Sequence, residues 1–338
     1  YDYHTGMTGV MIGGGNFAGF QAQAWKRLPV EIVAVADAAS EKARTFAKEF
    51  EFPHAYKSVE EMFERERPDF VDIATRPEPH LKLTSMVAAR GAHVICQKPM
   101  APTMDECNAM CEVCERAGVR LLIHENWRWQ PWYREAKRIL DSGQIGAMRR
   151  IEFDWRTGDG AGPKPYVTQP YFSSMPRLLI YETLVHILDT FRFLAGEFHV
   201  KGCETRRINP VIVAEDWAEI EVAFAAGATG KIRGDRVTGP VPAPVAMGSL
   251  LIEGEKGALK MAPDGHLFVT MRGEVERETD FAPTPLGYKG DSVFATQKHL
   301  IDCLRSGEPA ESEGREYLKT VALVEECYQL AGMANLTL

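Results

Sequence analysis

The stretch Thr-Gly-Val-Met-Ile-Gly-Gly-Gly-Asn-Phe-Ala-Gly, residues 8–19, decides the fold. An apolar strand runs into a turn in which Gly13, Gly15 and Ala18 keep the G-x-G-x-x-A spacing, and a helix follows. This order is typical of a dinucleotide-binding turn: Gly13 permits the bend, Gly15 lets the backbone approach a pyrophosphate, and Ala18 lets the helix pack on the strand. The first backbone N–H groups of the helix, beginning at Asn16 and Phe17, attract the phosphates.

An acidic residue follows the next apolar strand at the spacing that such a turn requires. Asp37 closes the run Val30–Ala36 and lies 22 residues after Gly15 (37 − 15), where a carboxylate binds the ribose hydroxyls. The same carboxylate would repel a 2′-phosphate, and the following Ala38-Ala39 provides no arginine, so we expect NAD rather than NADP. The alternative is a glycine-rich turn in which Asp37 merely caps the following helix.

Composition excludes several classes of protein. The formal net charge of −8 disfavours nucleic acids and anionic membranes as partners, because both bind basic surfaces. No apolar run approaches the ~18 residues of a membrane span, and no signal-peptide pattern is present. Seven cysteines in 338 residues do not form a disulfide framework, so we expect a cytoplasmic protein.

Three of these cysteines raise the question of a metal. Cys107, Cys111 and Cys114 follow an i, i+4, i+7 spacing behind the capping box of Thr103 and Glu106, so they share one face of a helix. Zinc would need a fourth ligand from elsewhere, and a buried stripe of thiols is the commoner outcome. We therefore expect no metal.

The chain up to residue 126 alternates short apolar runs with helical segments, which indicates a doubly wound parallel α/β sheet over residues 7–126. We expect the carboxyl ends of these strands, where Thr75, Lys98 and Asn126 lie, to face the ligand. The predicted strands are Val10–Gly14, Val30–Asp37, His54–Tyr56, Asp69–Thr75, Ala92–Lys98 and Arg120–Asn126.

Residues 127–338 have a different pattern, which predicts an α+β domain with a largely antiparallel sheet. Helices are expected at Trp132–Ser142 and Leu178–Leu194, with a Gly/Pro-rich segment at Thr157–Pro170 between them. Two helices close the chain, and they could pack back on the first domain. The predicted strands are Arg149–Arg156, Trp217–Phe224, Gly230–Asp235, Gly248–Glu253, Gly257–Met261 and His266–Arg272, and the closing helices are Ser292–Ser306 and Gly314–Met333.

Two positions carry the groups of an acid–base site. Lys98 lies at the carboxyl end of the predicted strand Ala92–Lys98 and precedes a proline, although a solvated loop lysine would also fit. Glu182 and His186 are four residues apart on a predicted helix and project from one face. A histidine with an acid one turn away is a plausible base, whereas a lone histidine on an apolar helix is usually a core residue.

With these motifs in order, the chain resembles the Gfo/Idh/MocA family of nicotinamide-dependent oxidoreductases over nearly its whole length. The resemblance rests on the glycine turn and on further short motifs that follow it in sequence. These are Ala74-Thr75-Arg76-Pro77 with His80, Gln97-Lys98-Pro99, Asn126-x-Arg128-x-x-Pro131, Gly143-x-x-Gly146 and the segment Glu182–Asp189.

The resemblance implies a Rossmann domain and a second domain with an open sheet, whose outer face commonly forms a homo-oligomer contact. It implies that Lys98, His186 and Glu182 form the catalytic set, and that the Lys98-Pro99 peptide is often cis. It also implies that the cofactor contacts extend from the glycine turn and Asp37 to further residues, namely Thr75, Arg76, Pro77, His80, Gln97 and Lys98. This chain departs from the family pattern at Gln97, where glutamate is usual, and at Glu182, where aspartate is usual.

Aromatic residues interleaved with polar ones at His124–Trp132 suit a sugar, whose C–H faces lie on rings while its hydroxyls meet polar groups. These tryptophans could equally seal a domain junction. The segments His93–Pro99 and His124–Gln130 look like the aldose-oxidising branch that contains D-apiose dehydrogenases, which implies a pentose or similar aldose oxidised to a lactone. We expect the substrate to meet Asn126, Trp127, Arg128, Arg156, Tyr166 and Arg177.

Two other functions remain open at this point. The family also contains enzymes that retain the cofactor and oxidise only transiently, which enables isomerisation, elimination or glycoside cleavage. A non-catalytic NAD(H)-binding sensor is the second possibility. The set Lys98, Glu182 and His186 favours a dehydrogenase over a sensor, because a sensor needs no base.

Overall fold

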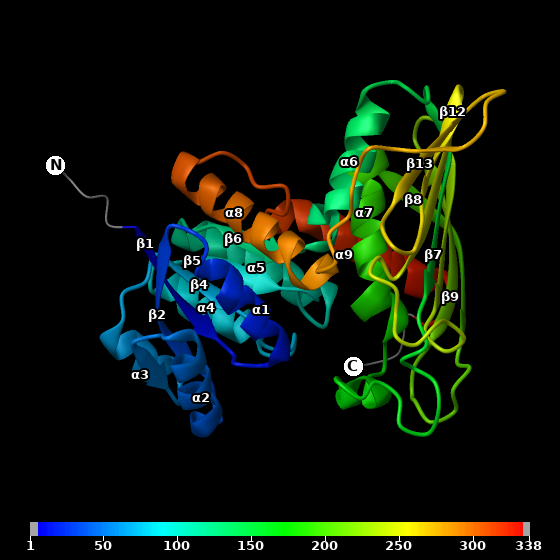
Figure 1. Ribbon diagram of the computed structural model, residues 1–338. Helices are drawn as coiled ribbons and strands as arrows, with labels where there is room; N and C mark the ends of the chain where they lie inside the picture. Colours follow the sequence, from blue (N-terminus) through cyan, green and yellow to red (C-terminus); the bar gives the residue numbers. More distant parts are fainter. Residues whose placement is uncertain (1–5, 334–338) are drawn as a thin grey trace. The chain divides into compact units, whose positions relative to one another are not determined.

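The computed structural model describes residues 6–333 and divides the chain into two compact units (Figure 1). One unit contains the residues up to Asn126 together with Val293–Lys319, and the other contains Trp127–Ser292 and the residues from Thr320 onward. Within the described range, no helix combines the length and apolarity needed to cross a membrane.

The first unit contains a six-stranded sheet in the order β3-β2-β1-β4-β5-β6, in which every neighbouring pair is parallel. The chain moves outward in one direction from β1 to β3 and in the other from β4 to β6. The crevice at this reversal is where doubly wound sheets bind their ligands. The strands are β1 (Met7–Ile12), β2 (Val30–Ala36), β3 (His54–Tyr56), β4 (Phe70–Ile73), β5 (His93–Gln97) and β6 (Leu121–His124).

Helices connect these strands, and their ends follow local sequence rules. Ser58 and Thr103 cap two of them by accepting the backbone N–H three residues ahead, at Glu61 and Glu106, and the sequence Ser58-x-x-Glu61 has the same capping-box spacing as Thr103-x-x-Glu106. Gly118 ends α5 in a left-handed conformation. The helices are α1 (Asn16–Trp25), α2 (Ser40–Phe50), α3 (Val59–Arg65), α4 (His80–Ala89), α5 (Met104–Ala117), α8 (Asp291–Ser306) and α9 (Gly314–Leu330), of which α8 begins in the second unit and α9 continues into it.

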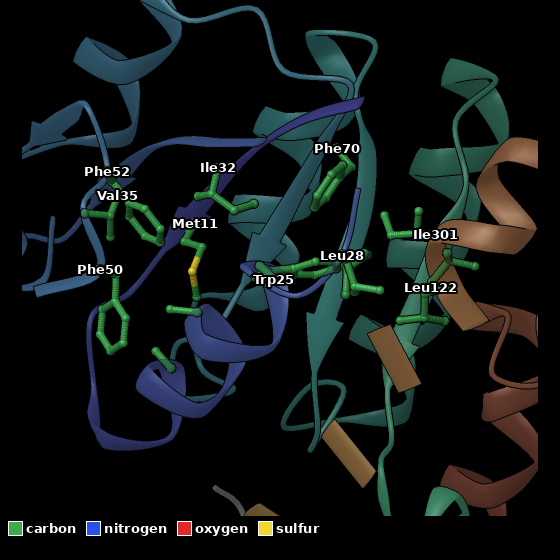
Figure 2. Packing of buried hydrophobic residues seen from close by; sticks show 14 of the residues in the cluster. Met11, Trp25, Leu28, Ile32, Val35, Phe50, Phe52, Phe70, Leu122 and Ile301 are labelled. Carbon is green, nitrogen blue, oxygen red and sulfur yellow. The ribbon is translucent and has the colours of Figure 1, made fainter. Parts of the chain in front are cut away.

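The core of the first unit joins sheet residues to α1, α2 and α8 (Figure 2). Trp25 lies against Phe70 with ring centroids 5.0 Å apart, and a Cβ on Gly9 would fall 2.4 Å from the Phe70 ring. Figure 2 shows Ile301 of α8 beside Leu122 of β6. Complete burial of side chains of this size stabilises the fold by about 1.5–3 kcal/mol each.

The second unit contains an eight-stranded sheet in the order β14-β13-β12-β11-β7-β10-β9-β8. All neighbouring pairs are antiparallel except β7 and β10, which run parallel. The strands are β7 (Met148–Arg156), β8 (Phe198–Arg206), β9 (Trp217–Phe224), β10 (Thr229–Asp235), β11 (Gly248–Gly254), β12 (Gly257–Met261), β13 (Leu267–Met271) and β14 (Arg277–Glu278).

One face of this sheet is covered and the other is more open. Along β7, Ile151, Phe153 and Trp155 are buried, whereas Arg150 and Glu152 between them are not. This period-two alternation is the signature of a sheet with one buried face. The helical segments of the unit are η1 (Trp127–Trp129), α6 (Pro131–Asp141), η2 (Pro170–Ser174), the π-helical η3 (Leu179–Leu184), α7 (Val185–Ala195) and η4 (Gly287–Lys289).

Most predicted elements are present, with shifts of one to three residues at their ends, but one prediction needs correction and two strands were not predicted. The helix predicted over Leu178–Leu194 is a π-helical turn followed by α7. Strand β8 was not predicted, because a bulge between Val200 and Gly202 breaks its alternation. The two-residue β14 was also not predicted, since so short a strand carries no pattern.

Candidate active site

The turn after β1 has the geometry that a bound dinucleotide requires. Gly13 has φ +97°, and a Cβ there would lie 2.9 Å from the Ala74 carbonyl oxygen, so only glycine fits. A Cβ on Gly15 would meet nothing within 4 Å, which leaves open space at the start of α1. Asn16 and Phe17 begin that helix, and the buried Ala18 packs against the sheet. These residues fit a pyrophosphate held at a helix N-terminus.

Asp37 lies one residue beyond β2 and faces this turn. Its Oδ2 accepts a 2.9 Å hydrogen bond from the Gly14 N–H, and its Oδ1 accepts one of 2.9 Å from the Ala39 N–H. The ammonium of Lys42 lies 3.9 Å from the same carboxylate. The carboxylate is therefore held at the carboxyl edge of β2, where an acid selects ribose hydroxyls over a 2′-phosphate.

The segment after β4 contains the next predicted cofactor contacts. Pro77 is buried, Thr75 is half-buried, and the exposed Arg76 pairs with Glu78 at 3.1 Å. The fully buried His80 has Nδ1 2.9 Å from the Met100 carbonyl oxygen and Nε2 3.1 Å from the Thr75 carbonyl oxygen. Burial lowers the pKa of this imidazole. The imidazole thus lies between carbonyl oxygens of the segments after β4 and β5, and in its neutral form it donates to one of them.

Lys98 follows β5 directly, at the predicted edge of the sheet, and its peptide bond to Pro99 is cis. The neighbouring Gln97 accepts a 2.9 Å hydrogen bond from the Lys98 N–H through its side-chain carbonyl. The Gln97 amide group donates in turn to Gln21 Oε1 at 3.2 Å. The side chain of Gln97 therefore contacts both the backbone of Lys98 and helix α1.

In the second unit, His186 lies among aromatic side chains. Its imidazole stacks on the indole of Trp127, with ring centroids 4.6 Å apart and an interplanar angle of 25°. The same indole contacts Trp155 at 5.1 Å and Tyr288 at 5.4 Å. His186 is 7% exposed and Trp127 is 2% exposed. The histidine predicted as a base is thus held by ring contacts on a largely buried surface.

Glu182 lies in the π-helical turn η3, one turn before His186. A buried carboxylate from another segment holds the start of this turn: Glu215 accepts from the Ile180 N–H at 3.1 Å and from the Leu178 N–H at 3.3 Å. The Tyr328 hydroxyl donates to Glu215 at 2.6 Å and accepts from the Tyr181 N–H at 3.0 Å. Burial raises the pKa of Glu215, although these hydrogen bonds oppose the shift.

The guanidinium of Arg236 joins the same turn to the Gly/Pro-rich segment. It donates to Thr183 Oγ1 at 2.9 Å, next to Glu182, and forms an ion pair with Asp159. It also lies 4.9 Å from the ring centroid of Tyr166. Glu182 and Asp159 both help to raise the pKa of Arg236 against the effect of its burial. A positive charge is thus fixed beside Glu182.

Several predicted substrate contacts already have protein partners. Arg128 forms a bidentate ion pair with Asp189, at 2.7 and 2.9 Å, which ties η1 to α7. Arg177 pairs with Glu325 at 2.7 Å and lies over the Tyr328 ring. Both guanidinium groups are buried, so their observed role is to hold the helices in place.

Three further predicted contacts differ in exposure. Arg156 is exposed and donates to Thr238 at 3.3 Å, and it points to the opposite face of β7 from Trp155. Tyr166 is 2% exposed, has φ +55°, and its buried hydroxyl meets no hydrogen-bond partner among the described residues. Asn126 is buried, two residues beyond β6. Trp127 is therefore the predicted contact that lies directly against His186.

The thiols of Cys107, Cys111 and Cys114 lie on the buried side of α5. Desolvation raises the pKa of Cys111 to about 11 and that of Cys114 to about 12, which keeps both thiols protonated at neutral pH. Within residues 6–333, no three His, Cys, Asp or Glu side chains gather in a way that could hold a metal ion.

Four residues of these clusters were not predicted from the sequence: Asp72, Gln21, Glu215 and Arg236. Asp72 had a local signal, since it is the one acid in the otherwise apolar strand β4. Gln21 lies one turn before Trp25 on α1, and both side chains reach Asp72. Glu215 and Arg236 had no local signal, because their partners lie far away along the chain.

Comparison with known families adds two matches. Residues 7–125 match the model described as "Oxidoreductase family, NAD-binding Rossmann fold", and residues 133–260 match the "GFO/IDH/MocA C-terminal domain". Together these matches cover most of the described chain. They agree with the parallel sheet of the first unit and the mostly antiparallel sheet of the second.

Relatives of known name are similar along nearly the whole chain. A D-apiose dehydrogenase of Paraburkholderia graminis is 34% identical over 328 residues, which is 95% of this chain and 86% of the relative. A D-apiose dehydrogenase of Rhizobium rhizogenes is 33% identical over 337 residues, which is 97% of this chain and 96% of the relative.

Among solved structures, an oxidoreductase from Agrobacterium radiobacter in complex with NAD⁺, L-tartaric acid and magnesium has a TM-score of 0.91. It is 32% identical, and the match covers 97% of each chain. A levoglucosan dehydrogenase in complex with NADH and levoglucosan has a TM-score of 0.86 at 19% identity, over 96% of this chain and 97% of the other, and it shows the shared fold.

Proposed function

The chain belongs to the GFO/IDH/MocA family of oxidoreductases, and from this premise we propose that it is an NAD-dependent sugar dehydrogenase. It oxidises a hydroxyl-bearing carbon of an aldose or polyol. The observation that carries this proposal is the similarity, along nearly the whole chain, to two D-apiose dehydrogenases. The geometry around Asp37 and around His186 supports it.

The cofactor is NAD. The turn at Gly13 and Gly15 fits a pyrophosphate, and the carboxylate of Asp37 suits a ribose with both hydroxyls present. When bound, NAD supplies the acceptor for the hydride that leaves the sugar carbon. Thr75, Arg76, Pro77 and Gln97 are further proposed contacts, and His80 acts by holding Thr75.

His186 serves as the general base that takes the proton from the reacting hydroxyl. Lys98 donates a hydrogen bond to the same oxygen and stabilises the negative charge that develops on it. Glu182 orients this pair from the turn that Glu215 holds. The reaction is balanced: one C–H and one O–H bond break, a C=O bond forms, and NADH and a proton are released. For an aldose oxidised at its anomeric carbon, the product is a lactone.

The substrate lies against aromatic surface. Trp127 presents an indole next to His186, and aromatic faces of this kind pack against the C–H side of a sugar ring. Asn126 is a further proposed contact. Tyr166 of the Gly/Pro-rich segment and Arg236, which follows β10, bound the same region, while Arg128 and Arg177 act by positioning helices. Arg156 is proposed as a more distant contact, because it faces the other side of β7.

The test follows nicotinamide absorbance while the purified protein meets a panel of aldoses and polyols, with NAD and NADP in parallel. D-apiose belongs in the panel because of the two relatives, and L-tartrate because the Agrobacterium radiobacter structure contains tartaric acid. Steady NADH formation with one sugar class supports the proposal. Product without free NADH, from protein that retains its cofactor, would instead indicate transient oxidation. Binding of NAD without any product would favour a sensor.

A homo-oligomer formed through the open face of the large sheet is part of the proposal. That face carries opposite charges at close range, as where Lys231 and Arg233 meet Glu219 at 3.4 and 3.2 Å. Sedimentation analysis tests it, and a monomer at all concentrations would contradict it. We also propose a cytoplasmic location, because all seven cysteines are free thiols.

A further inference from the structure

A continuous line of hydrogen bonds runs from a buried carboxylate to the backbone of Lys98. Asp72 accepts from Gln21 Nε2, with 2.9 Å to Oδ1 and 3.0 Å to Oδ2. Gln21 Oε1 accepts from Gln97 Nε2 at 3.2 Å, and Gln97 Oε1 accepts from the Lys98 N–H at 2.9 Å. Asp72 also accepts from the Trp25 indole at 2.7 Å. The line thus joins β4, α1 and the end of β5.

Both ends of this line have a fixed polarity. An ionised carboxylate, which is the state of Asp72 above its raised pKa, only accepts, and a backbone N–H only donates. Between them lie two amides, each of which must turn its NH₂ group toward Asp72 and its carbonyl toward Lys98. A reversed amide at either position would set donor against donor or acceptor against acceptor, and such a mismatch is costly in a buried site.

The line is also rigidly supported. Asp72 and Gln21 are both 0% exposed. The Gln297 amide of α8 donates to the Gln21 backbone carbonyl at 3.1 Å, and Gln297 Oε1 lies 3.0 Å from His124 Nε2. Residues of β4, β5 and α8 therefore hold Gln21. The hydrogen bond to Asp72 sets which way the side-chain amide of Gln21 is turned, and this in turn sets the orientation of Gln97.

We propose that Asp72 and Gln21 are positioning residues that act through Gln97 to hold the backbone of Lys98 in place for the reaction. This inference rests on the proposed function, because it assigns a purpose to the placement of Lys98. It also accounts for the amide at position 97. A glutamate there would set one of its oxygens against Gln21 Oε1 and would add a second negative charge close to Asp72.

The environment of Asp72 agrees with this role. Complete burial raises its pKa to about 7, against the lowering effect of the Trp25 and Gln21 hydrogen bonds. Burying a carboxyl group is costly unless it is hydrogen-bonded, and Asp72 meets this condition through Trp25 and Gln21. After desolvation by burial, the negative charge of Asp72 contributes to raising the pKa of the Cys96 thiol.

The experiment moves the negative charge of the hydrogen-bonded line from position 72 to position 97, first with each substitution alone and then with both together. In Asp72→Asn, one oxygen still accepts from Trp25, and the new amide group faces Gln21. If Gln21 goes on donating to the retained oxygen, which it reaches at 3.0 Å in the original protein, its NH₂ group also meets the new NH₂ group at position 72. If Gln21 and Gln97 reverse instead, an NH₂ group meets the Lys98 N–H. In Gln97→Glu, acceptor meets acceptor at Gln21.

The double variant, Asp72→Asn with Gln97→Glu, restores the match at every link. The new amide at position 72 donates to Gln21, and the reversed Gln21 donates to the new carboxylate at position 97. That carboxylate in turn accepts from the Lys98 N–H. Each donor again meets an acceptor, now with the charge at the other end of the line.

The measurements are kcat and KM for NAD-dependent sugar oxidation and the urea midpoint of unfolding, for both single variants, the double variant and Lys98→Ala. We expect each single variant to lower kcat at least about tenfold with KM within about threefold of the original, and the double variant to recover kcat to within about threefold. The unfolding midpoint recovers in the same pattern. Asp105→Asn and Gln144→Glu, which make the same chemical changes at exposed positions, serve as controls and leave kcat unchanged.

Three outcomes would overturn the inference, and they separate it from the proposed function. Additive losses of kcat in the double variant, with Lys98→Ala inactive, would leave the role of Lys98 intact and remove the positioning role of Asp72. Recovery of the unfolding midpoint without recovery of kcat would show a hydrogen-bonded line that does not act on Lys98. Full activity of Lys98→Ala would contradict both proposals.

Discussion

The imidazole of His186 lies flat on the indole of Trp127, with ring centroids 4.6 Å apart and planes inclined by 25°. Because both side chains are almost completely buried, this stack fixes the plane in which the His186 nitrogens can point. A base must meet its proton in line, so an aromatic neighbour that fixes the ring also fixes the direction of proton transfer. The stack therefore links packing in the second unit to the proposed chemistry.

Trp127→Phe keeps an aromatic face under His186, whereas Trp127→Ala removes it. We expect the phenylalanine variant to retain kcat/KM for the sugar within about fivefold and the alanine variant to lose about 10²-fold, because the ring would no longer be held in line. Circular dichroism checks that both variants fold. Trp217→Phe on β9 is the matched control and leaves kcat/KM unchanged. Equal kinetics for Trp127→Ala and the original protein would contradict the role of the stack.

Asp37→Ala tests the choice of cofactor. The substitution removes the carboxylate that accepts from the Gly14 N–H, and it leaves the Lys42 ammonium, now 3.9 Å from that carboxylate, without its anionic neighbour. We expect the ratio of kcat/KM for NAD to that for NADP to fall at least about tenfold. The double variant, Asp37→Ala with Lys42→Ala, separates two effects on NADP. It removes the repulsion between Asp37 and the 2′-phosphate, but it leaves no Lys42 ammonium to attract that phosphate. An unchanged ratio would show that the carboxylate does not select the cofactor.

Burial of Asp72 makes stability depend on pH. Its folded-state pKa of about 7 lies above the ordinary value of 3.8, so the stability that this carboxyl contributes is full below about pH 4 and is lost as pH rises through about 7. The shift corresponds to up to about 4 kcal/mol. We expect the unfolding free energy of the original protein, relative to Asp72→Asn, to fall by up to that amount between about pH 4 and about pH 8.

The indole N–H of Trp25 reports the same ionisation, because it donates to Asp72 at 2.7 Å. Its NMR cross-peak, identified with Trp25→Phe, should move with a midpoint near pH 7 and should stay still in Asp72→Asn. A cross-peak that does not titrate between about pH 5 and about pH 9 would contradict the raised pKa.

Tyr328→Phe tests the support of the π-helical turn. The change removes the hydroxyl that donates to Glu215 and accepts from the Tyr181 N–H. Two buried groups then lack a partner, and we expect the free energy of unfolding to fall by about 1–3 kcal/mol. Glu215→Gln should have a similar effect, since one of its three donors would meet an amide group. Glu204→Gln, which breaks an exposed ion pair with Arg206, should change stability by less than about 1 kcal/mol.

Features that depend on neighbouring residues could be predicted from the sequence. The glycine turn, the two capping boxes and the positions of Thr75, Lys98 and Asn126, just beyond the ends of β4, β5 and β6, are all determined within about ten residues of chain. The position of Asp37 also follows from local spacing, and in the structure its carboxylate accepts from the Gly14 N–H.

Features that depend on distant partners could not be predicted in this way. Gln21 and Asp72 are 51 residues apart in sequence, and Leu178 and Glu215 are 37 apart. Nothing near Leu178 indicates that a carboxylate from a later segment will hold the helix in a π-helical turn. Similarly, Arg128 was expected to meet substrate because its ion pair with Asp189, 61 residues away, carries no local signal.

The central claim is most directly tested by the initial rate of NADH formation from NAD and D-apiose or a related aldose, with the original protein, Lys98→Ala and His186→Ala side by side. We expect steady NADH formation by the original protein and a loss of about 10²–10⁴-fold in each variant. Absence of NADH formation with every aldose and polyol, by protein that demonstrably binds NAD, would contradict the account.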